Sequence, residues 1–191
     1  TDTDNIKITI LSGGMKNAVY LIENNGNKVV LKIAPKDESK MITADRNILW
    51  WEVEMLKLME KIDFPSPRLL CYDDSCSLCE SPYIFMSYID GMIYLEMREK
   101  MSKEERNNVE YQLGILSKRI CSIIGQEFFL PSQPNKRFKN NYEFTMNLFE
   151  LLLENAKFKN INLGENNYDN IKNIIASNKE SLNNISNLCL A

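Results

Sequence analysis

Lys32 and Glu52 are two charged residues that stand where the surrounding pattern favours apolar ones. Lys32 lies in KVVLKIAP, between Leu31 and Ile33, in a run typical of a buried strand. Glu52 lies in NILWWEVEMLKLMEKI, and at about 100° per residue it falls among the apolar residues of a helix. That apolar side consists of Ile48, Trp51, Met55, Met59 and Ile62. A charged group that faces a core must be paired or must give up its charge.

An ion pair between Lys32 and Glu52 would satisfy both residues at once. Each residue alone has a simpler explanation, because Glu52 could sit at a helix edge and Lys32 could extend its ammonium group to solvent. Their occurrence together, a strand lysine followed by a helix glutamate, favours the pair. Protein kinases use this arrangement to hold nucleotide phosphates, with the lysine as a point charge and the carboxylate fixing its direction.

The first ninety residues predict the elements that would position this pair. Alternating and apolar segments bounded by turn residues indicate five strands with one helix inserted after the third. The residues at 24–27, NNGN, favour a tight turn, so the second and third strands should form a hairpin. The strands are expected at 6–11, 18–23, 28–34, 68–74 and 81–91, and the helix at 44–62. We therefore expect an α+β fold with a five-stranded antiparallel sheet.

The composition changes near Asp90 and Gly91, after which the chain becomes helical. We expect two domains, a nucleotide-binding lobe at 1–90 and the start of a helical lobe at 91–191. Ser102 and Glu105 form a capping-box signal at the start of the next helix. That helix carries apolar residues at Val109, Leu113, Leu116, Ile120 and Ile124. Further helices are expected at 141–158 and 168–182, and the last residues, SNLCLA, resemble the start of a buried strand.

The segment LSGGMKNAVY, Leu11 to Tyr20, joins the first two predicted strands. Its two glycines permit the close backbone approach that a phosphate-binding loop needs. It is not a Walker loop, because no Gly-Lys-Ser or Gly-Lys-Thr follows. Taken alone, this segment is also compatible with an ordinary hairpin turn.

The order of these features resembles the aminoglycoside phosphotransferase and choline-kinase-like family, which has a protein-kinase-like fold. The matching segments are GGMKNAVYLI, VVLKIAP, WWEVEMLKLM, FPSPRLLCYD and YIFMSYIDG, over roughly residues 6 to 130. The resemblance implies that Lys32 binds the α- and β-phosphates and that Glu52 orients it. It also implies that Ser12, Gly13 and Asn17 line the nucleotide loop and that Val19 packs on the base. The base would bond to the Ser87 carbonyl and the Ile89 amide.

The resemblance further implies an enzyme that uses ATP or GTP with Mg²⁺, and the richness in Asn, Lys and Ile indicates an AT-rich, bacterial genome. The enzyme's partner would be a small hydroxyl-bearing acceptor such as an aminoglycoside, which would make it an antibiotic-resistance protein. Two departures from the family pattern accompany the matches. Ile120 and Cys121 replace the usual Leu-His pair, a change that affects a mainly structural position. The family's His-Gly-Asp-like catalytic loop and its metal-binding aspartate have no counterpart in the sequence, so we expect an inactive N-terminal fragment.

A metal site formed by cysteines is a second hypothesis. Cys71, Cys76 and Cys79 follow the C-x₄-C-x₂-C spacing of plant-type two-iron ferredoxins, and Cys189 is a possible fourth ligand. Thiolates at this spacing could also bind zinc. Against this hypothesis, the segment CYDDSCSLC has no glycine to turn backbone amides onto sulfur, and it places two aspartates beside an anionic cluster.

Composition excludes some functions. The sequence has no histidine, so His-dependent catalysis and His-ligated metals are excluded for this chain. The net charge of −3, with both signs interspersed, argues against binding to nucleic acid or to a membrane surface. An odd count of five cysteines favours reduced thiols in a cytoplasm. A third hypothesis is a non-catalytic, pseudokinase-like interaction domain, against which the presence of both Lys32 and Glu52 argues mildly.

Overall fold

The computed structural model describes residues 5–11, 16–162, 164, 168–185 and 188–189. The chain divides into two compact units, Thr1–Asp90 and Gly91–Ala191, and each is described by itself. That the first unit binds a nucleotide remains a prediction.

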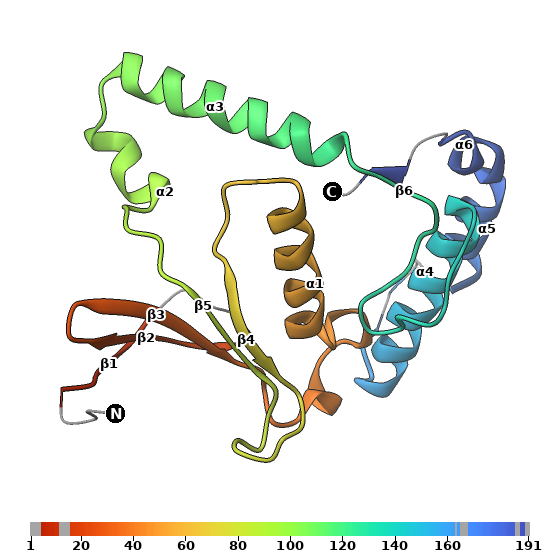
Figure 1. Ribbon diagram of the computed structural model, residues 1–191. Helices are drawn as coiled ribbons and strands as arrows, with labels where there is room; N and C mark the ends of the chain where they lie inside the picture. The colour runs from red at the N-terminus through yellow and green to blue at the C-terminus, as the bar shows by residue number, and fades with distance from the viewer. Residues whose placement is uncertain (1–4, 12–15, 163, 165–167, 186–187, 190–191) are drawn as a thin grey trace. The chain divides into compact units, whose positions relative to one another are not determined.

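The first unit contains a five-stranded antiparallel sheet (Figure 1). The strand order is β1-β2-β3-β5-β4, so the fifth strand of the chain inserts between the third and the fourth. The strands are β1 (Lys7–Ile10), β2 (Ala18–Asn24), β3 (Asn27–Ile33), β4 (Leu69–Asp73) and β5 (Tyr83–Ser87). The prediction of an α+β fold with five antiparallel strands and one helix is confirmed.

The hairpin of β2 and β3 closes where the sequence predicts. Asn24 pairs with Asn27, which leaves Asn25 and Gly26 as the two turn residues. Both have positive φ, 49° at Asn25 and 81° at Gly26. Two left-handed residues in a two-residue loop match the right-handed twist of the strands, which is why Asn-Gly is favoured there.

Helix α1 (Ile48–Lys61) is shorter than the predicted 44–62. Two 3₁₀ turns precede it, η1 (Glu38–Lys40) and η2 (Thr43–Asp45). Asn47 has a φ of 61°, a left-handed conformation that cannot continue an α-helix. The Asn47 amide donates a 2.9 Å hydrogen bond to the Glu38 carboxylate, which fixes this break. The start of α1 is therefore set by a contact with the preceding turn.

The core of the first unit lies between α1 and one face of the sheet, called here the inner face (Figure 1). It consists of Val30, Ala34, Leu49, Val53, Leu56, Ile84 and Met86. The predicted apolar side of the helix is wrong in most of its members. On α1 the structure buries Leu49, Val53, Leu56 and Met59, and only Met59 belongs to the predicted set. Glu52 lies next to this buried face because Val53 follows it and Leu56 lies one turn later.

Strands β4 and β5 are joined by a connector that carries its own hydrogen bonds. The register shifts between Leu69 and Cys71, so Leu70 forms a bulge. The Asp73 carboxylate accepts hydrogen bonds from the Ser75 amide at 2.8 Å and from the Tyr83 hydroxyl at 2.9 Å. Burial, and then the neighbouring Asp74 carboxylate, raises the pKa of Tyr72 to about 12, so this inner-face tyrosine is neutral at physiological pH.

The second unit consists mainly of helices, as predicted. Its elements are α2 (Tyr94–Met97), η3 (Arg98–Lys100), α3 (Lys103–Cys121), β6 (Ile124–Gly125), α4 (Asn141–Phe158), α5 (Tyr168–Ser177), α6 (Lys179–Asn183) and β7 (Leu188–Cys189). The capping box of Ser102 and Glu105 is present in full at the start of α3. The predicted helix at 168–182 is interrupted at Asn178, which separates α5 from α6. The predicted terminal strand begins as β7, which pairs antiparallel with β6.

Helix α3 is shorter than predicted and largely exposed. It ends at Cys121, and Ile124 belongs to β6 rather than to the helix. None of its residues is buried, and Tyr111 and Leu113 are more than half exposed. Among the described residues, no helix is long and apolar enough to cross a membrane.

Candidate functional site

Lys32 and Glu52 form the ion pair that the sequence predicts. The Lys32 Nζ and Glu52 Oε1 atoms lie 2.5 Å apart, and about a quarter of each side chain is exposed, 24% and 26%. Lys32 lies on the inner face of β3, where Val30 and Ala34 on either side of it are buried. The pair therefore joins the sheet to α1 at the edge of the core, where both groups still reach solvent.

Apolar side chains surround Lys32 on the inner face. Val19 of β2 and Ile84 of β5 are its direct neighbours across the two ladders. Ile84 is fully buried, and Val19 is partly buried against the core. The Lys32 ammonium group can therefore bind the anionic part of a ligand whose apolar or aromatic part packs against these side chains.

Sequence reasoning missed two inner-face residues of this surface. Val30 lies two residues before Lys32, and Met86 pairs with Val30 across the ladder. Both are buried, at 8% and 6% exposure. Strand alternation could have found Val30, since it shares a face with Lys32. Met86 could not be placed beside it without the register of β3 and β5.

The predicted base-binding segment lies at the end of β5. The Ser87 amide donates to the Arg68 carbonyl at 2.9 Å, whereas the Arg68 amide donates to Ser87 Oγ and not to the Ser87 carbonyl. Hydrogen-bonded and non-hydrogen-bonded pairs alternate along an antiparallel ladder. Because the Ala34 amide donates to the Pro82 carbonyl, this alternation makes Val29 and Ser87 a non-hydrogen-bonded pair. Ile89 is 57% exposed and follows the strand.

The predicted phosphate loop is only partly described. Ser12 and Gly13 lie outside the described residues. Asn17 lies in the bend just before β2 and is half-buried. Its neighbour Lys16 forms an ion pair with Asp45 of η2, with 2.8 Å between Nζ and Oδ1. The loop is thus joined at one end to the segment that precedes α1.

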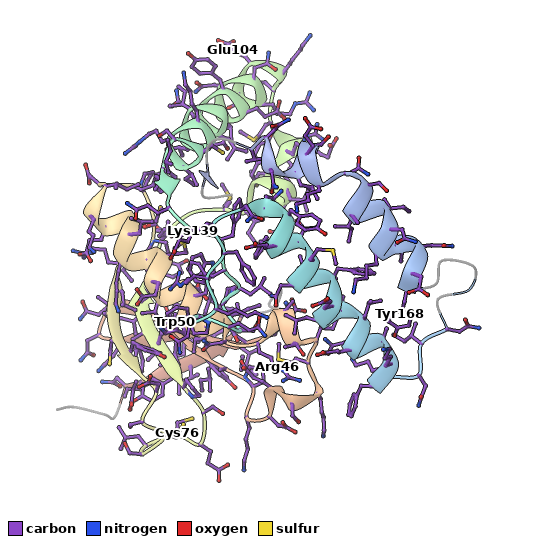
Figure 2. The ribbon with its side chains drawn as sticks, turned by 90° about the vertical axis from the view of Figure 1, so that its right-hand side faces the viewer. Arg46, Trp50, Cys76, Glu104, Lys139 and Tyr168 are labelled. Atoms are coloured by element: carbon purple, nitrogen blue, oxygen red, sulfur yellow. The ribbon has the colours of Figure 1, made fainter. Side chains whose placement is uncertain are left out.

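The cysteines of the metal hypothesis are free thiols where the structure describes them. Cys71 is exposed on β4, and Cys76 and Cys79 lie in the connector between β4 and β5. Figure 2 shows Cys76 in the loop at the tip of this hairpin. Across the described part of the chain, no group of three or more His, Cys, Asp or Glu side chains could hold a metal ion. The side chain of Cys189 is outside that description.

The second unit has a hollow of about 370 Å³ beside α4. It is lined by Lys136, Phe138, Tyr142, Glu143, Met146, Asn147, Glu150 and Lys172. Asn147 is buried, and its side chain bonds to the ammonium of Lys136 and, at 3.1 Å, to Gln133. Two lysines and two glutamates line the same hollow, so its charge favours neither an anionic nor a cationic ligand.

Comparison with known proteins agrees with this geometry. A family model described as the phosphotransferase enzyme family matches residues 7–159. The chain belongs to the phosphotransferase enzyme family. The match includes β1 to β5, α1 and most of the second unit up to the end of α4. The resemblance inferred from the sequence motifs is therefore confirmed.

A solved structure supports the same fold for this family member. It is the crystal structure of a candidate aminoglycoside phosphotransferase from Ralstonia eutropha JMP134, with a TM-score of 0.57 and 9% sequence identity. The match covers 94% of this chain and 49% of the other, so the chain spans about half the length of that protein. At this identity the likeness concerns the fold alone. No curated protein matches the chain.

Proposed function

We propose that the first unit binds the phosphates and base of ATP or GTP in a phosphotransferase that acts on a hydroxyl of a small molecule. The observation that carries this proposal is the ion pair between Lys32 and Glu52, formed at the edge of the core in a member of the phosphotransferase family. A lysine held by a carboxylate is the device by which kinase-like proteins fix a cation against phosphate oxygens.

Each proposed contact uses a group that the fold makes available. Lys32 Nζ binds the α- and β-phosphate oxygens, and Glu52 holds that ammonium group in place. Val19 on the inner face packs against the base. The Ser87 carbonyl accepts a hydrogen bond from the base and the Ile89 amide donates one. The Arg68 amide donates to Ser87 Oγ and not to the Ser87 carbonyl. This supports the proposed role, because the carbonyl then stays available to accept a hydrogen bond from the base.

The phosphoryl-transfer step needs a catalytic aspartate and Mg²⁺ ligands, which we assign to no residue of this chain. In the proposed reaction, the acceptor hydroxyl attacks the γ-phosphorus, the bond to the bridging β,γ-oxygen breaks, and an aspartate takes the hydroxyl proton. None of the aspartates in the sequence has an asparagine five residues later, which is the family's catalytic-loop spacing. The described residues hold no group of ligands suited to Mg²⁺, so we assign it to no residue here. We propose that this chain alone binds nucleotide without transferring phosphate.

The acceptor is proposed on the family relationship alone. The solved relative is described as a candidate aminoglycoside phosphotransferase, so an aminoglycoside is our first proposal, followed by another small hydroxyl-bearing metabolite. An antibiotic-resistance role in a bacterial cytoplasm follows only if the acceptor is an aminoglycoside.

Isothermal titration calorimetry with ATP and GTP tests nucleotide binding directly. We expect Lys32→Ala to raise the Kd for nucleotide about tenfold or more, which corresponds to about 1.4 kcal/mol. We expect Glu52→Gln to raise it by a smaller factor, because the ammonium group remains but is no longer oriented.

Lys36→Ala is a matched control for this titration. Lys36 and Glu80 also form a 2.5 Å ion pair at the end of β3, but their side chains are 70% and 77% exposed. We expect this change to leave the Kd within about twofold. Equal effects of Lys32→Ala and Lys36→Ala would contradict the proposed role of Lys32. A folded chain that binds neither nucleotide would instead favour the interaction-domain hypothesis.

A further inference from the structure

The face of the sheet opposite α1, called here the outer face, is largely apolar. Strand pairing places side chains from all five strands on it, since residues directly opposite each other point to the same side. These residues are Ile8, Ile10, Ala18, Tyr20, Ile22, Asn24, Asn27, Val29, Leu31, Ile33, Cys71, Asp73, Tyr83, Phe85 and Ser87. Among the described elements of the first unit, no helix lies against this face (Figure 1).

Strand β1 has its polar residues on the inner face and its apolar residues on the outer face, the reverse of a strand that covers a core. Lys7 and Thr9 point to the inner face, where Lys7 pairs with Glu23. Ile8 and Ile10 point to the outer face and are 62% and 75% exposed. In a strand with one buried face, alternation normally places the apolar residues on that face. The pattern of β1 therefore favours a partner that covers the outer face.

The charge of the outer face limits the kind of partner. Within the strands, Asp73 is its one charged side chain among the described residues, and its carboxylate is already bonded to the Tyr83 hydroxyl. Arg68 flanks it just before β4. An anionic surface or a charged peptide would need complementary charges that this face lacks. A homodimer interface, in contrast, is apolar and depleted of charge at its centre.

The size of the outer face is sufficient for the centre of such an interface. Five strands about 4.8 Å apart, with a rise of about 3.3 Å per residue, give a footprint of about 400 to 500 Å² before side-chain relief is counted. A specific interface buries about 800 Å² of accessible surface on each partner. The footprint of the strands is about half of this area, so the proposed interface also includes side-chain relief and the rim of the face.

We propose that two copies of this chain associate through their outer faces, sheet on sheet. The isoleucines of β1 and the apolar residues of β2, β3 and β5 are buried between the copies, in the manner of two packed sheets about 10 Å apart. The side chains proposed to bind the nucleotide lie on the inner face, and the proposed base contacts of Ser87 and Ile89 are backbone groups, so association and nucleotide binding are separate properties.

Analytical ultracentrifugation of the full 191-residue chain, from about 1 to about 100 µM, tests the association. We expect a dimer at the upper end of this range. Ile8→Lys and Ile10→Lys are expected to raise the dimer dissociation constant about tenfold or more, because each buries an ammonium group in the interface. Both residues are exposed, so the fold should tolerate the changes.

Thr9→Lys is the matched control, because it adds the same charge to β1 on the inner face. We expect it to leave the dissociation constant within about twofold. Edge-to-edge pairing of β1 would instead be weakened by all three lysines, since charge on an edge strand opposes pairing. A monomer at every concentration would overturn the proposal. So would a dimer that the Ile8 and Ile10 changes leave intact, or one that Thr9→Lys also disrupts.

Thiol alkylation of the unsubstituted protein provides a test that needs no variant. Cys71 lies on the outer face, whereas Cys76 lies in the connector of the same hairpin, and both are exposed in the single chain. Association should protect Cys71 but not Cys76 from iodoacetamide. We expect the ratio of Cys71 to Cys76 alkylation, measured by mass spectrometry, to rise when the protein is diluted. A ratio that does not depend on concentration would overturn the proposal.

Discussion

At the scale of single residues, the ion pair of Lys32 and Glu52 has a stabilising role that can be measured apart from any ligand. About a quarter of each side chain is exposed, so its contribution lies between that of surface pairs and that of fully buried ones. We expect a double-mutant cycle with Lys32→Met and Glu52→Met to give a coupling free energy of about 1 to 2 kcal/mol in urea unfolding.

The pair of Lys36 and Glu80 serves as the control for that cycle. Its N–O distance is equally short, but most of each side chain is exposed. We expect a coupling of about 0 to 0.5 kcal/mol for this pair. Equal couplings would mean that the partial burial of Lys32 and Glu52 has no energetic consequence.

Asp73 and Tyr83 predict a pH dependence at one end of the sheet. Hydrogen bonds from the Ser75 side chain, the Ser75 amide and the Tyr83 hydroxyl lower the pKa of Asp73. Because the pKa is lowered in the folded state, the stabilisation is complete above the unfolded pKa of about 3.9 and is lost as the pH falls through the folded pKa. We expect the hairpin of β4 and β5 to weaken in acid, observed as lower amide protection factors in β4 below about pH 4, each taken relative to the intrinsic exchange rate at that pH.

The hydrogen bond between Asp73 and Tyr83 also changes the pKa of the tyrosine, which moves up where that of the aspartate moves down. The hydrogen bond to Asp73, followed by burial, raises the pKa of Tyr83. Its stabilisation is present below the ordinary tyrosine pKa of about 10 and is lost above the raised value. We expect Asp73→Asn to lower the pKa of Tyr83 in an NMR titration. An unchanged titration would show that the hydrogen bond does not persist in solution.

At the scale of elements, the turn between β2 and β3 depends on Gly26. A Cβ there would meet no atom within 4 Å, but the φ of 81° is unfavourable for any residue with a side chain. We expect Gly26→Ala to lower the free energy of unfolding by about 1 kcal/mol. Gly91→Ala is the control, because Gly91 is equally open and has no positive φ. Similar losses for both would indicate that backbone strain is not the cause.

The start of α3 depends on Ser102. Its hydroxyl accepts from the Glu105 amide at 3.2 Å, and the Glu105 carboxylate accepts from the Ser102 amide at 2.8 Å. We expect Ser102→Ala to cost about 1 kcal/mol in thermal or urea unfolding. Ser117→Ala, inside the same helix, should be neutral or slightly stabilising because alanine is the better helix former. The cap would lack its assigned role if both changes had the same effect.

At the scale of the whole molecule, the first unit has a complete core of its own. Every residue of that core lies between Val30 and Met86. We expect residues 1–90 produced alone to fold cooperatively, with dispersed amide NMR signals and a sigmoidal urea transition. A chain of this length buries enough surface to be marginally stable. If residues 1–90 alone were disordered, the two units would be compact in the structure but would not fold independently.

Much of this fold could be predicted from the sequence because the signals are local. The Asn25-Gly26 turn, the cap at Ser102 and the span of α4 depend on dihedral preferences and hydrogen bonds within a few residues. The predictions that were wrong concern boundaries and faces. The start of α1 depends on Glu38, nine residues before Asn47. The buried side of α1 depends on the sheet it meets.

By itself, the sequence determined the five strands of the first unit, their main turn, and the presence of a lysine and a glutamate suited to pairing. Only the tertiary structure decided that these two side chains, 20 residues apart, lie within hydrogen-bond distance. It also decided that Ile8 and Ile10 face away from the core. The physical reason is that a strand's register sets its faces, and a shift of one residue would reverse them. Register and helix packing depend on contacts between distant segments, which no local pattern contains.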